Sequence, residues 1–363
     1  MKKLSFLLIS MFFIACSQNN AVKTKAELLE VLKKTAEKGE ILYGHQDDFF
    51  YGHSWVGENG RSDTKDVCGA YPAVLGIDLG KIEYNSEFSL DSVPFAFMRE
   101  KIIEHCSRGG IVAASWHVDN PMTNGNSWDI ACDTVVRAIL NETSETHAVF
   151  MQYLKNLSDF LLTLKYENGE NIPLIFRPYH ENSGSWFWWG KNFCTENEYI
   201  ALWRLTKNYL DARGLTNLIY CYSPNLGADK AEYLSRYAGD DFVDLLGFDI
   251  YQFPQKNENG EIVDLADGVY IENVTRSLSF LTEIGKEHNK PIAFTETGCE
   301  SIPNPKWWSE TLLPAIENFP ICYVLTWRNA HNRPEHYYST FAGEQSADDF
   351  LIFFNNKKIR FLE

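Results

Sequence analysis

Positive charge is scarce in this 363-residue sequence, which has 33 Lys and Arg residues against 49 Asp and Glu residues. The formal net charge is -16, and a chain of that charge repels nucleic-acid phosphates and anionic lipid surfaces. The sequence therefore predicts no nucleic-acid partner. Low-complexity linkers and blocks of like charge are also missing, whereas hydrophobic residues make up 45% of the chain. This composition is typical of a globular protein with a large core.

Two common motifs are absent as well. The eight cysteines include no CxxC pair, so the spacing of zinc fingers and of thioredoxin-like redox sites is not found. Without Cys16, which is considered next, seven cysteines could form up to three disulfide bridges, and the spacing leaves their pairing open. The segment Gly44–Asp48 reads GHQDD and lacks the Gly-rich phosphate loop of a doubly wound nucleotide-binding sheet.

Long apolar segments are missing after the start of the chain. Lys2 and Lys3 precede an apolar run that ends in Phe13-Ile14-Ala15-Cys16, which is similar to a lipobox. We expect residues 1–15 to be a signal peptide, and residues 16–22 to be a lipidated cysteine with a short polar tether. The protein would then be exported and attached to a membrane only through this lipid anchor, on a side that the sequence does not specify.

Short runs rich in β-branched and aromatic residues recur along the rest of the chain. The runs are Ile41–Tyr43, Ala73–Ile77, Ile111–Trp116, Pro173–Phe176, Leu218–Tyr222, Val243–Phe248, Pro291–Thr295 and Ile321–Thr326. Most are continuously apolar, which is typical of parallel strands buried on both faces. These runs therefore predict eight parallel strands.

Helical patterns lie between the predicted strands. The clearest is an apolar stripe from Phe150 to Leu164, and capping boxes at Thr24 and Thr195 begin two more helices. Further helices are predicted at Val93–Cys106, Asp229–Tyr237, Ile271–His288, Trp307–Ile316 and Ala347–Asn356. Strands and helices that alternate eight times predict a single (β/α)8 TIM barrel over residues 23–363, with its functional site at the carboxyl ends of the strands.

Polar and aromatic side chains follow nearly every predicted strand. They are His45, Asp78, His117, His180 with Glu181, Ser223, Asp249 with Tyr251, Glu296, and Trp327 with Arg328. Glu181 follows the fourth strand and Glu296 the seventh, and these strands face each other across a closed barrel. A pair of carboxyl groups ~5–5.5 Å apart suits glycoside hydrolysis with retention, in which one acts as the acid and the other as the nucleophile.

Aromatic residues are dense beside these two carboxylates. Trp186, Phe187, Trp188 and Trp189 follow Glu181, Trp128 lies in the loop after the third strand, and Trp327 follows the eighth. Indole rings stack on the apolar faces of sugars. We therefore expect this run of aromatic residues to contact a carbohydrate ligand.

Several motifs together resemble glycoside hydrolase family 26, the β-mannanase family of a retaining (β/α)8 clan. The motifs are Gly44-His45-Gln46, Arg177-Pro178-Tyr179-His180-Glu181, Phe248-Asp249-Ile250-Tyr251, Phe294-Thr295-Glu296 and Thr326-Trp327-Arg328-Asn329. The match runs from Gly44 to Asn329. It implies that the barrel over residues 23–363 is catalytic and cleaves β-1,4-mannosidic bonds in neutral mannan, galactomannan, glucomannan or their oligosaccharides, without a cofactor or metal.

The resemblance also implies roles for individual residues. Glu181 would be the acid/base and Glu296 the nucleophile. His180 would orient the acid and contact the sugar, and Tyr251 would hydrogen-bond the nucleophile. The remaining implied sugar contacts are Trp186 beside the cleavage point, Trp327 under the sugar on the non-reducing side, His117 and Arg328 on hydroxyls there, and Trp128.

Four alternatives stay open at this stage. Related enzymes hydrolyse mixed-linkage β-glucan or β-1,3-xylan, and a barrel that had lost catalysis would be a glycan-binding lipoprotein. A metal-dependent barrel hydrolase could use His45, Asp47, His53, His117 and His180, although His45 followed by Asp47 departs from the paired histidines such enzymes carry on the first strand. The long connections 116–133 and 52–71 could also close one end of the cleft, so that mannobiose is released.

Overall fold

The structure is a computed structural model that describes residues 21–225, 227 and 229–362. The predicted signal peptide, the lipidated Cys16 and most of the tether lie outside the described residues. Within the described part of the chain, no helix combines the length and hydropathy that crossing a membrane requires.

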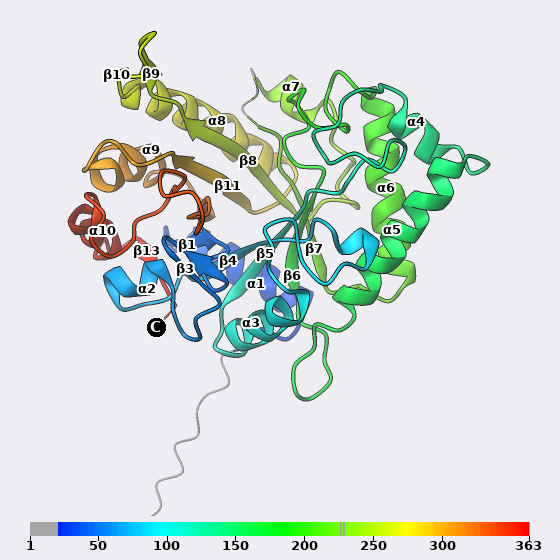
Figure 1. Ribbon diagram of the computed structural model, residues 1–363, viewed down its shortest axis with the longest axis horizontal. Coiled ribbons are helices and arrows are strands. Elements are labelled where there is room, and N and C mark those ends of the chain that lie inside the picture. The colour runs from blue at the N-terminus through cyan, green and yellow to red at the C-terminus, as the bar shows by residue number, and fades with distance from the viewer. Residues whose placement is uncertain (1–20, 226, 228, 363) are drawn as a thin grey trace, which may run out of the picture.

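A closed barrel of parallel strands forms the centre of the molecule (Figure 1). Its strands are β1 (Ile41–Gln46), β4 (Val74–Asp78), β5 (Ile111–Trp116), β6 (Leu174–Pro178), β7 (Leu218–Tyr222), β8 (Leu245–Gln252), β11 (Ile292–Cys299) and β12 (Ile321–Thr326). They pair in this order, and β12 pairs with β1 to close the ring, with Leu42 opposite Tyr323. The short strand β13 (Ile359–Arg360) also pairs with β1. All eight predicted strands and the predicted TIM barrel are confirmed.

Helices surround this barrel (Figure 1). The predicted ones are α1 (Lys25–Glu37), α3 (Phe95–Ser107), α5 (Glu145–Leu161), α6 (Glu196–Ala212), α7 (Lys230–Leu234), α8 (Asp267–Glu287) and α10 (Ala347–Phe354). Both predicted capping boxes are present, at Thr24 and at Thr195. The segment predicted as one helix over 307–316 is a π-helical turn, η2 (Trp307–Leu312), followed by α9 (Leu313–Ile316). Pro314, which has no backbone N–H to donate, lies directly after the junction.

Additional short elements lie in the loops. They are α2 (Asp63–Cys68), η1 (Ile82–Tyr84), α4 (Val135–Leu140), the hairpin β2 (Tyr51–Gly52) with β3 (Trp55–Val56), and the hairpin β9 (Gln255–Lys256) with β10 (Ile262–Asp264). Each is too short to produce a clear hydrophobic period.

One end of the barrel is covered by α1. Leu28 and Leu32 of this helix are buried in one cluster with Val74, Ile219 and Cys322 from the strands. The opposite end, where the strands reach their carboxyl termini, carries the long loops. All seven cysteines that the structure describes are free thiols, so none of the possible disulfide bridges forms among them.

Candidate active site

The loop after β6 places Glu181 in a strained but well-anchored turn. Tyr179 and Glu181 both have positive φ angles, of 48° and 53°, which cost free energy for residues other than glycine. The backbone N–H of Glu181 donates to the carbonyl of Ser223 at 2.7 Å, and the indole of Trp189 donates to the carbonyl of His180 at 2.8 Å. These bonds fix the direction in which the Glu181 side chain points.

Glu296 lies on β11 and is held by two neighbours. The hydroxyl of Tyr251 donates to its Oε1 at 2.6 Å, and the guanidinium of Arg177 donates to its Oε2. Arg177 also donates to Asp249 Oδ2 at 2.5 Å, so one buried cation joins two buried carboxylates. The preferred orientation of the Glu296 carboxylate is therefore set before any ligand binds.

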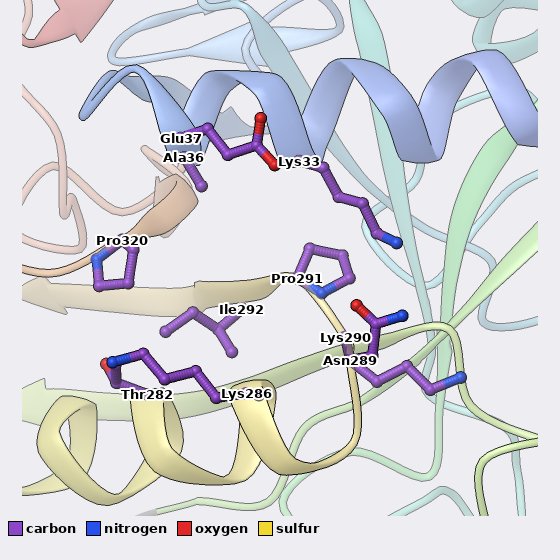
Figure 2. A pocket seen from close by; sticks show the side chains of 11 residues that line it. Lys33, Ala36, Glu37, Thr282, Lys286, Asn289, Lys290, Pro291, Ile292 and Pro320 are labelled. Carbon is purple, nitrogen blue, oxygen red and sulfur yellow. The ribbon is translucent and has the colours of Figure 1, made fainter.

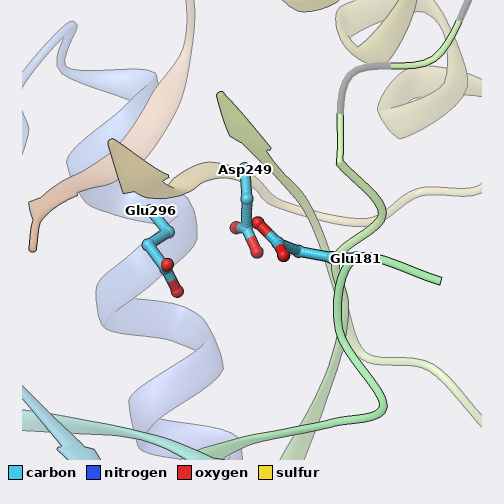
Figure 3. A group of neighbouring side chains, drawn as sticks. All are labelled: Glu181, Asp249 and Glu296. Atoms are coloured by element: carbon cyan, nitrogen blue, oxygen red, sulfur yellow. The ribbon is translucent and has the colours of Figure 1, made fainter. Parts of the chain in front are cut away.

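The side chains of Glu181, Asp249 and Glu296 converge over the carboxyl end of the barrel (Figure 3). One carboxylate oxygen from each residue lies within 4.8 Å of those from the other two. Retaining glycosidases hold their two carboxyl groups ~5–5.5 Å apart, whereas inverting enzymes need ~6.5–9.5 Å to admit a water molecule. The arrangement fits direct attack by one carboxylate.

Electrostatics favour a proton on Glu181. Burial, followed by the charges of Glu296 and Asp249, raises the pKa of Glu181 well above its usual range. Burial also raises the pKa of Asp249 to about 7, against the opposing effect of Arg177. Glu296 accepts hydrogen bonds from the Tyr251 hydroxyl and the Arg177 guanidinium, which orient its carboxylate. The geometry thus offers an acid and a nucleophile.

Two histidines lie beside the carboxylates, and their pKa values are shifted in opposite directions. Burial lowers the pKa of His117, but the Asp78 carboxylate 2.5 Å from its Nδ1 reverses this effect and raises the pKa above its usual range. Burial and the positive charges of Arg177 and His117 lower the pKa of His180 well below its usual range. Among the described residues, the buried Nδ1 of His180 has no hydrogen-bond partner. The pKa values of the two imidazoles are thus shifted in opposite directions at the same end of the barrel.

The aromatic run after Glu181 divides into one exposed ring and three buried ones. Trp186 is 39% exposed, and its Nε1 donates to Glu181 Oε2 at 2.7 Å. Phe187, Trp188 and Trp189 are buried, and Trp186 is the ring of this run that presents a face to solvent. The burial of the three rings follows from packing under the loop, where Trp188 donates to the carbonyl of Val118 at 3.0 Å. Contact of the whole run with carbohydrate stays a prediction.

Gly184 makes room for the exposed ring. A Cβ at this position would lie 2.3 Å from Cη2 of Trp186, so only glycine allows the indole to lie across the turn. On the other side of the site, Trp128 is 48% exposed and stacks on His117, with ring centroids 5.1 Å apart. The predicted aromatic contacts Trp186 and Trp128 therefore both present surface to solvent.

Trp327 and Arg328 follow β12 and lie on the β1 side of the site. Trp327 is partly exposed, and its ring centroid is 6.4 Å from that of His117. Arg328 pairs with Asp91 at 2.9 Å and contacts the hydroxyl of Tyr51 at 3.3 Å. A cavity of about 510 Å³, lined by Tyr51, Asp91 and several apolar side chains, adjoins this ion pair.

The histidines considered for a metal-dependent hydrolase do not form a metal-ligating group in the part of the chain that the structure describes. The group there with suitable spacing is Glu181, Asp249 and Glu296. Arg177 already supplies a positive charge to two of these carboxylates. Two of the three carboxylates in this group therefore already share a cation that the protein itself supplies.

A second pocket, of about 400 Å³, lies at the opposite end of the barrel (Figure 2). It is formed between α1 and α8, and Lys33, Lys286 and Lys290 line it together with Ile292 at the start of β11. Barrel enzymes carry their chemistry at the carboxyl ends of the strands. This pocket is at the other ends and contains none of the residues described above.

Sequence reasoning missed the supporting role of three residues. The sequence analysis placed Arg177 in a motif and placed Asp78 and Asp249 after predicted strands. It did not predict that any of the three positions another side chain. The position of Arg177 provides a signal, because it directly follows the apolar residues Leu174–Phe176 in a strand that is buried throughout. A buried arginine needs buried carboxylates as partners, and the candidates at the same end of the barrel were Asp78, Glu181, Asp249 and Glu296.

The sequence of this chain is similar to those of known glycoside hydrolases. The sequence model of glycosyl hydrolase family 26 matches residues 17–310. A mannan endo-1,4-beta-mannosidase of Bifidobacterium adolescentis is 29% identical, and the alignment covers 94% of this chain and 35% of that protein. The chain thus spans about a third of the length of this relative. A mannan endo-1,4-beta-mannosidase of Bacillus subtilis is 26% identical, with coverage of 72% of this chain and 68% of the relative.

Solved structures of similar proteins share the fold. A GH26 beta-mannanase of Bacteroides ovatus is 48% identical and superposes with a TM-score of 0.87, over 92% of this chain and 94% of that one. The catalytic domain of a GH26 endo-beta-1,4-mannanase of Bacillus sp. JAMB-750 is 29% identical, with a TM-score of 0.83 and coverage of 95% and 93%.

Proposed function

Because this chain belongs to glycosyl hydrolase family 26, we propose that it hydrolyses β-1,4-mannosidic bonds in mannan or manno-oligosaccharides with retention of configuration. The observation that carries the proposal is the convergence of the Glu181 and Glu296 carboxylates within 4.8 Å over the barrel mouth. Relatives named as mannan endo-1,4-beta-mannosidases support the choice of substrate. A neutral polysaccharide also suits a chain with a formal net charge of -16.

The two carboxyl groups act in sequence. Glu296 attacks the anomeric carbon while Glu181 protonates the departing sugar oxygen, and a glycosyl ester forms on Glu296. Glu181, now ionised, takes a proton from water, which displaces Glu296 and releases a product with the β configuration. Because its pKa is raised, Glu181 keeps the proton that it donates in the first step. In the second step, Arg177 and Tyr251 stabilise Glu296 as the leaving carboxylate.

Residues around the pair bind the sugar units in this proposal. His180 contacts the sugar and orients Glu181, and the exposed ring of Trp186 stacks on a sugar beside the scissile bond. The non-reducing side is formed by His117, Trp128, Trp327 and Arg328, which lie together beyond β5 and β12.

We propose further that this end of the cleft is short, so that mannobiose is released. Two ion pairs support the proposal by tying together the loops that follow the strands there. Arg328 pairs with Asp91, and Lys81 pairs with Asp119 at 2.6 Å. Loops anchored to each other in this way can form an end wall to the cleft. Export and lipid attachment through Cys16 remain our proposal for the location of the enzyme.

A product time course on mannan, galactomannan, lichenan and xylan tests the proposal. We expect reducing ends from the first two substrates, with mannobiose as the early product, and none from Glu181→Ala under the same conditions. Early mixtures of longer fragments with a rapid fall in viscosity would contradict release of mannobiose but not hydrolysis. Preference for lichenan or xylan would overturn the assignment to mannan, and binding without any product would indicate a glycan-binding protein.

A further inference from the structure

Phe253 is an exposed aromatic residue at the catalytic end of the barrel that none of the roles above includes. It follows β8 directly and exposes 77% of its surface. Its ring centroid lies 6.3 Å from that of Tyr251, whose hydroxyl donates to Glu296. A large apolar ring is thus held in solvent next to a residue that contacts the proposed nucleophile.

The backbone beneath Phe253 is firmly anchored. The side chain of Gln252 is buried and donates to the carbonyl of Leu265 at 2.6 Å and to Asp267 at 2.9 Å. The indole of Trp307 donates to the Gln252 Oε1 at 2.6 Å. These bonds close the base of the loop that contains the β9–β10 hairpin, which projects beyond the barrel (Figure 1). The backbone that carries Phe253 is therefore anchored before a ligand arrives, which lowers the entropy cost of binding.

The order of the strands shows on which side of the cleavage point Phe253 lies. Phe253 follows β8 and Trp186 follows β6, so the two exposed rings flank β7. In this eight-stranded ring, β7 lies opposite β1. Trp327 and Arg328 follow β12, which is the neighbour of β1. The non-reducing sugars were assigned to the β1 side. A chain that crosses the carboxylates from there extends toward Trp186 and Phe253.

We infer that Phe253 forms a binding site for a β-linked hexose unit on the leaving-group side of the scissile bond, beyond the unit that stacks on Trp186. This inference rests on the proposed function. The apolar C–H face of the sugar covers the ring, and the gain resembles that of other aromatic stacking contacts. Ile262 and Val263 of the adjoining hairpin are 43% and 64% exposed, which extends the apolar surface in the same loop.

The test compares two substrates in Phe253→Ala. Mannopentaose places sugars on both sides of the bond, whereas an aryl β-mannobioside has a leaving group without a sugar. We expect kcat/KM on mannopentaose to fall roughly threefold to tenfold, and kcat/KM on the aryl substrate to change by less than about twofold. Phe253→Trp, which keeps an aromatic ring, should have a kcat/KM on mannopentaose close to that of the wild-type protein. Ile352→Ala, which truncates another exposed apolar side chain, on α10, is the matched control and should change neither value.

Two results would overturn the inference. One is equal activity of Phe253→Ala and the wild-type protein on mannopentaose. The other is an equal loss on both substrates, which would indicate a structural role for the ring and would be accompanied by a lower Tm. Failure of the proposed function is a separate result, because the wild-type protein itself would then release no product from mannopentaose.

Discussion

The indole of Trp186 donates a 2.7 Å hydrogen bond to the carboxyl group of Glu181, five residues earlier in the same loop. One side chain thus combines a ring that is 39% exposed with direct contact to the proposed acid. The bond stabilises the charged form of Glu181 and so lowers its pKa, against the larger effect of burial, which raises it. Removing only the donor should therefore move the titration of the acid without removing the ring.

Trp186→Phe tests this relationship. Loss of the N–H raises the pKa of Glu181 further, so the acid stays protonated to higher pH. We expect the alkaline limb of the kcat/KM profile to move to higher pH, and kcat/KM at the optimum to fall by less than about tenfold because the ring remains. Trp128→Phe, which has no hydrogen bond to Glu181, is the control. An alkaline limb that stays in place, or moves to lower pH, would contradict the assignment of Glu181 as the acid.

The two catalytic roles can be separated with leaving groups of different basicity. Glu181→Ala should lower kcat/KM on mannan by roughly 10²–10⁴-fold, yet largely keep the first step on a dinitrophenyl β-mannobioside, whose leaving group needs no proton. Glu296→Ala should lose several orders of magnitude in rate on both substrates. Both variants should stay folded, as measured by circular dichroism and Tm. Near-normal turnover by either variant on mannan would overturn the assignment.

Arg177 is predicted to matter for folding as well as for catalysis. Arg177→Met leaves Asp249 and Glu296 buried without their shared cation, and removal of one partner of a buried pair costs about 3–5 kcal/mol. Urea denaturation should show a loss of that size in the free energy of unfolding. Arg61→Met, which breaks solvent-exposed pairs with Glu58 and Asp66, should cost less than about 1 kcal/mol. Combining Arg177→Met with Asp249→Asn should recover part of the loss.

An Arg177→Met protein as stable as the wild type would contradict this account of the ion-paired cluster. So would a double variant that is less stable than the single one, because neutralising Asp249 should relieve the repulsion between the two carboxylates.

The barrel could be predicted from the sequence because its strands are buried on both faces and are therefore continuously apolar. The short hairpin β9–β10 and the short helices α2 and α4 have no comparable hydrophobic pattern, and tertiary contacts determine whether these elements form. Likewise, Trp186, Trp188 and Trp189 look alike in sequence, but only the first is exposed, since the path of an irregular loop determines which rings pack beneath it.

The proximity of Glu181 and Glu296 could be predicted because a closed barrel brings together residues at the carboxyl ends of its strands. Glu181 follows β6 and Glu296 lies on β11, three strands further around the ring, and the structure brings their carboxylate oxygens within 4.8 Å of each other. The link from Arg177 to Asp249 and Glu296 depends on the side-chain directions within three strands, which strand order does not specify. The role of Asp78 in holding His117 depends in the same way on neighbouring strands β4 and β5.

The configuration of the first product tests the central claim most directly, because it depends on whether one of the two carboxylates attacks the sugar or a water molecule does. Proton NMR during the first minutes of mannopentaose hydrolysis, before mutarotation, should show the new reducing end in the β configuration. Initial formation of the α anomer would contradict the account, since it requires a water molecule between two carboxylates that the structure holds within 4.8 Å.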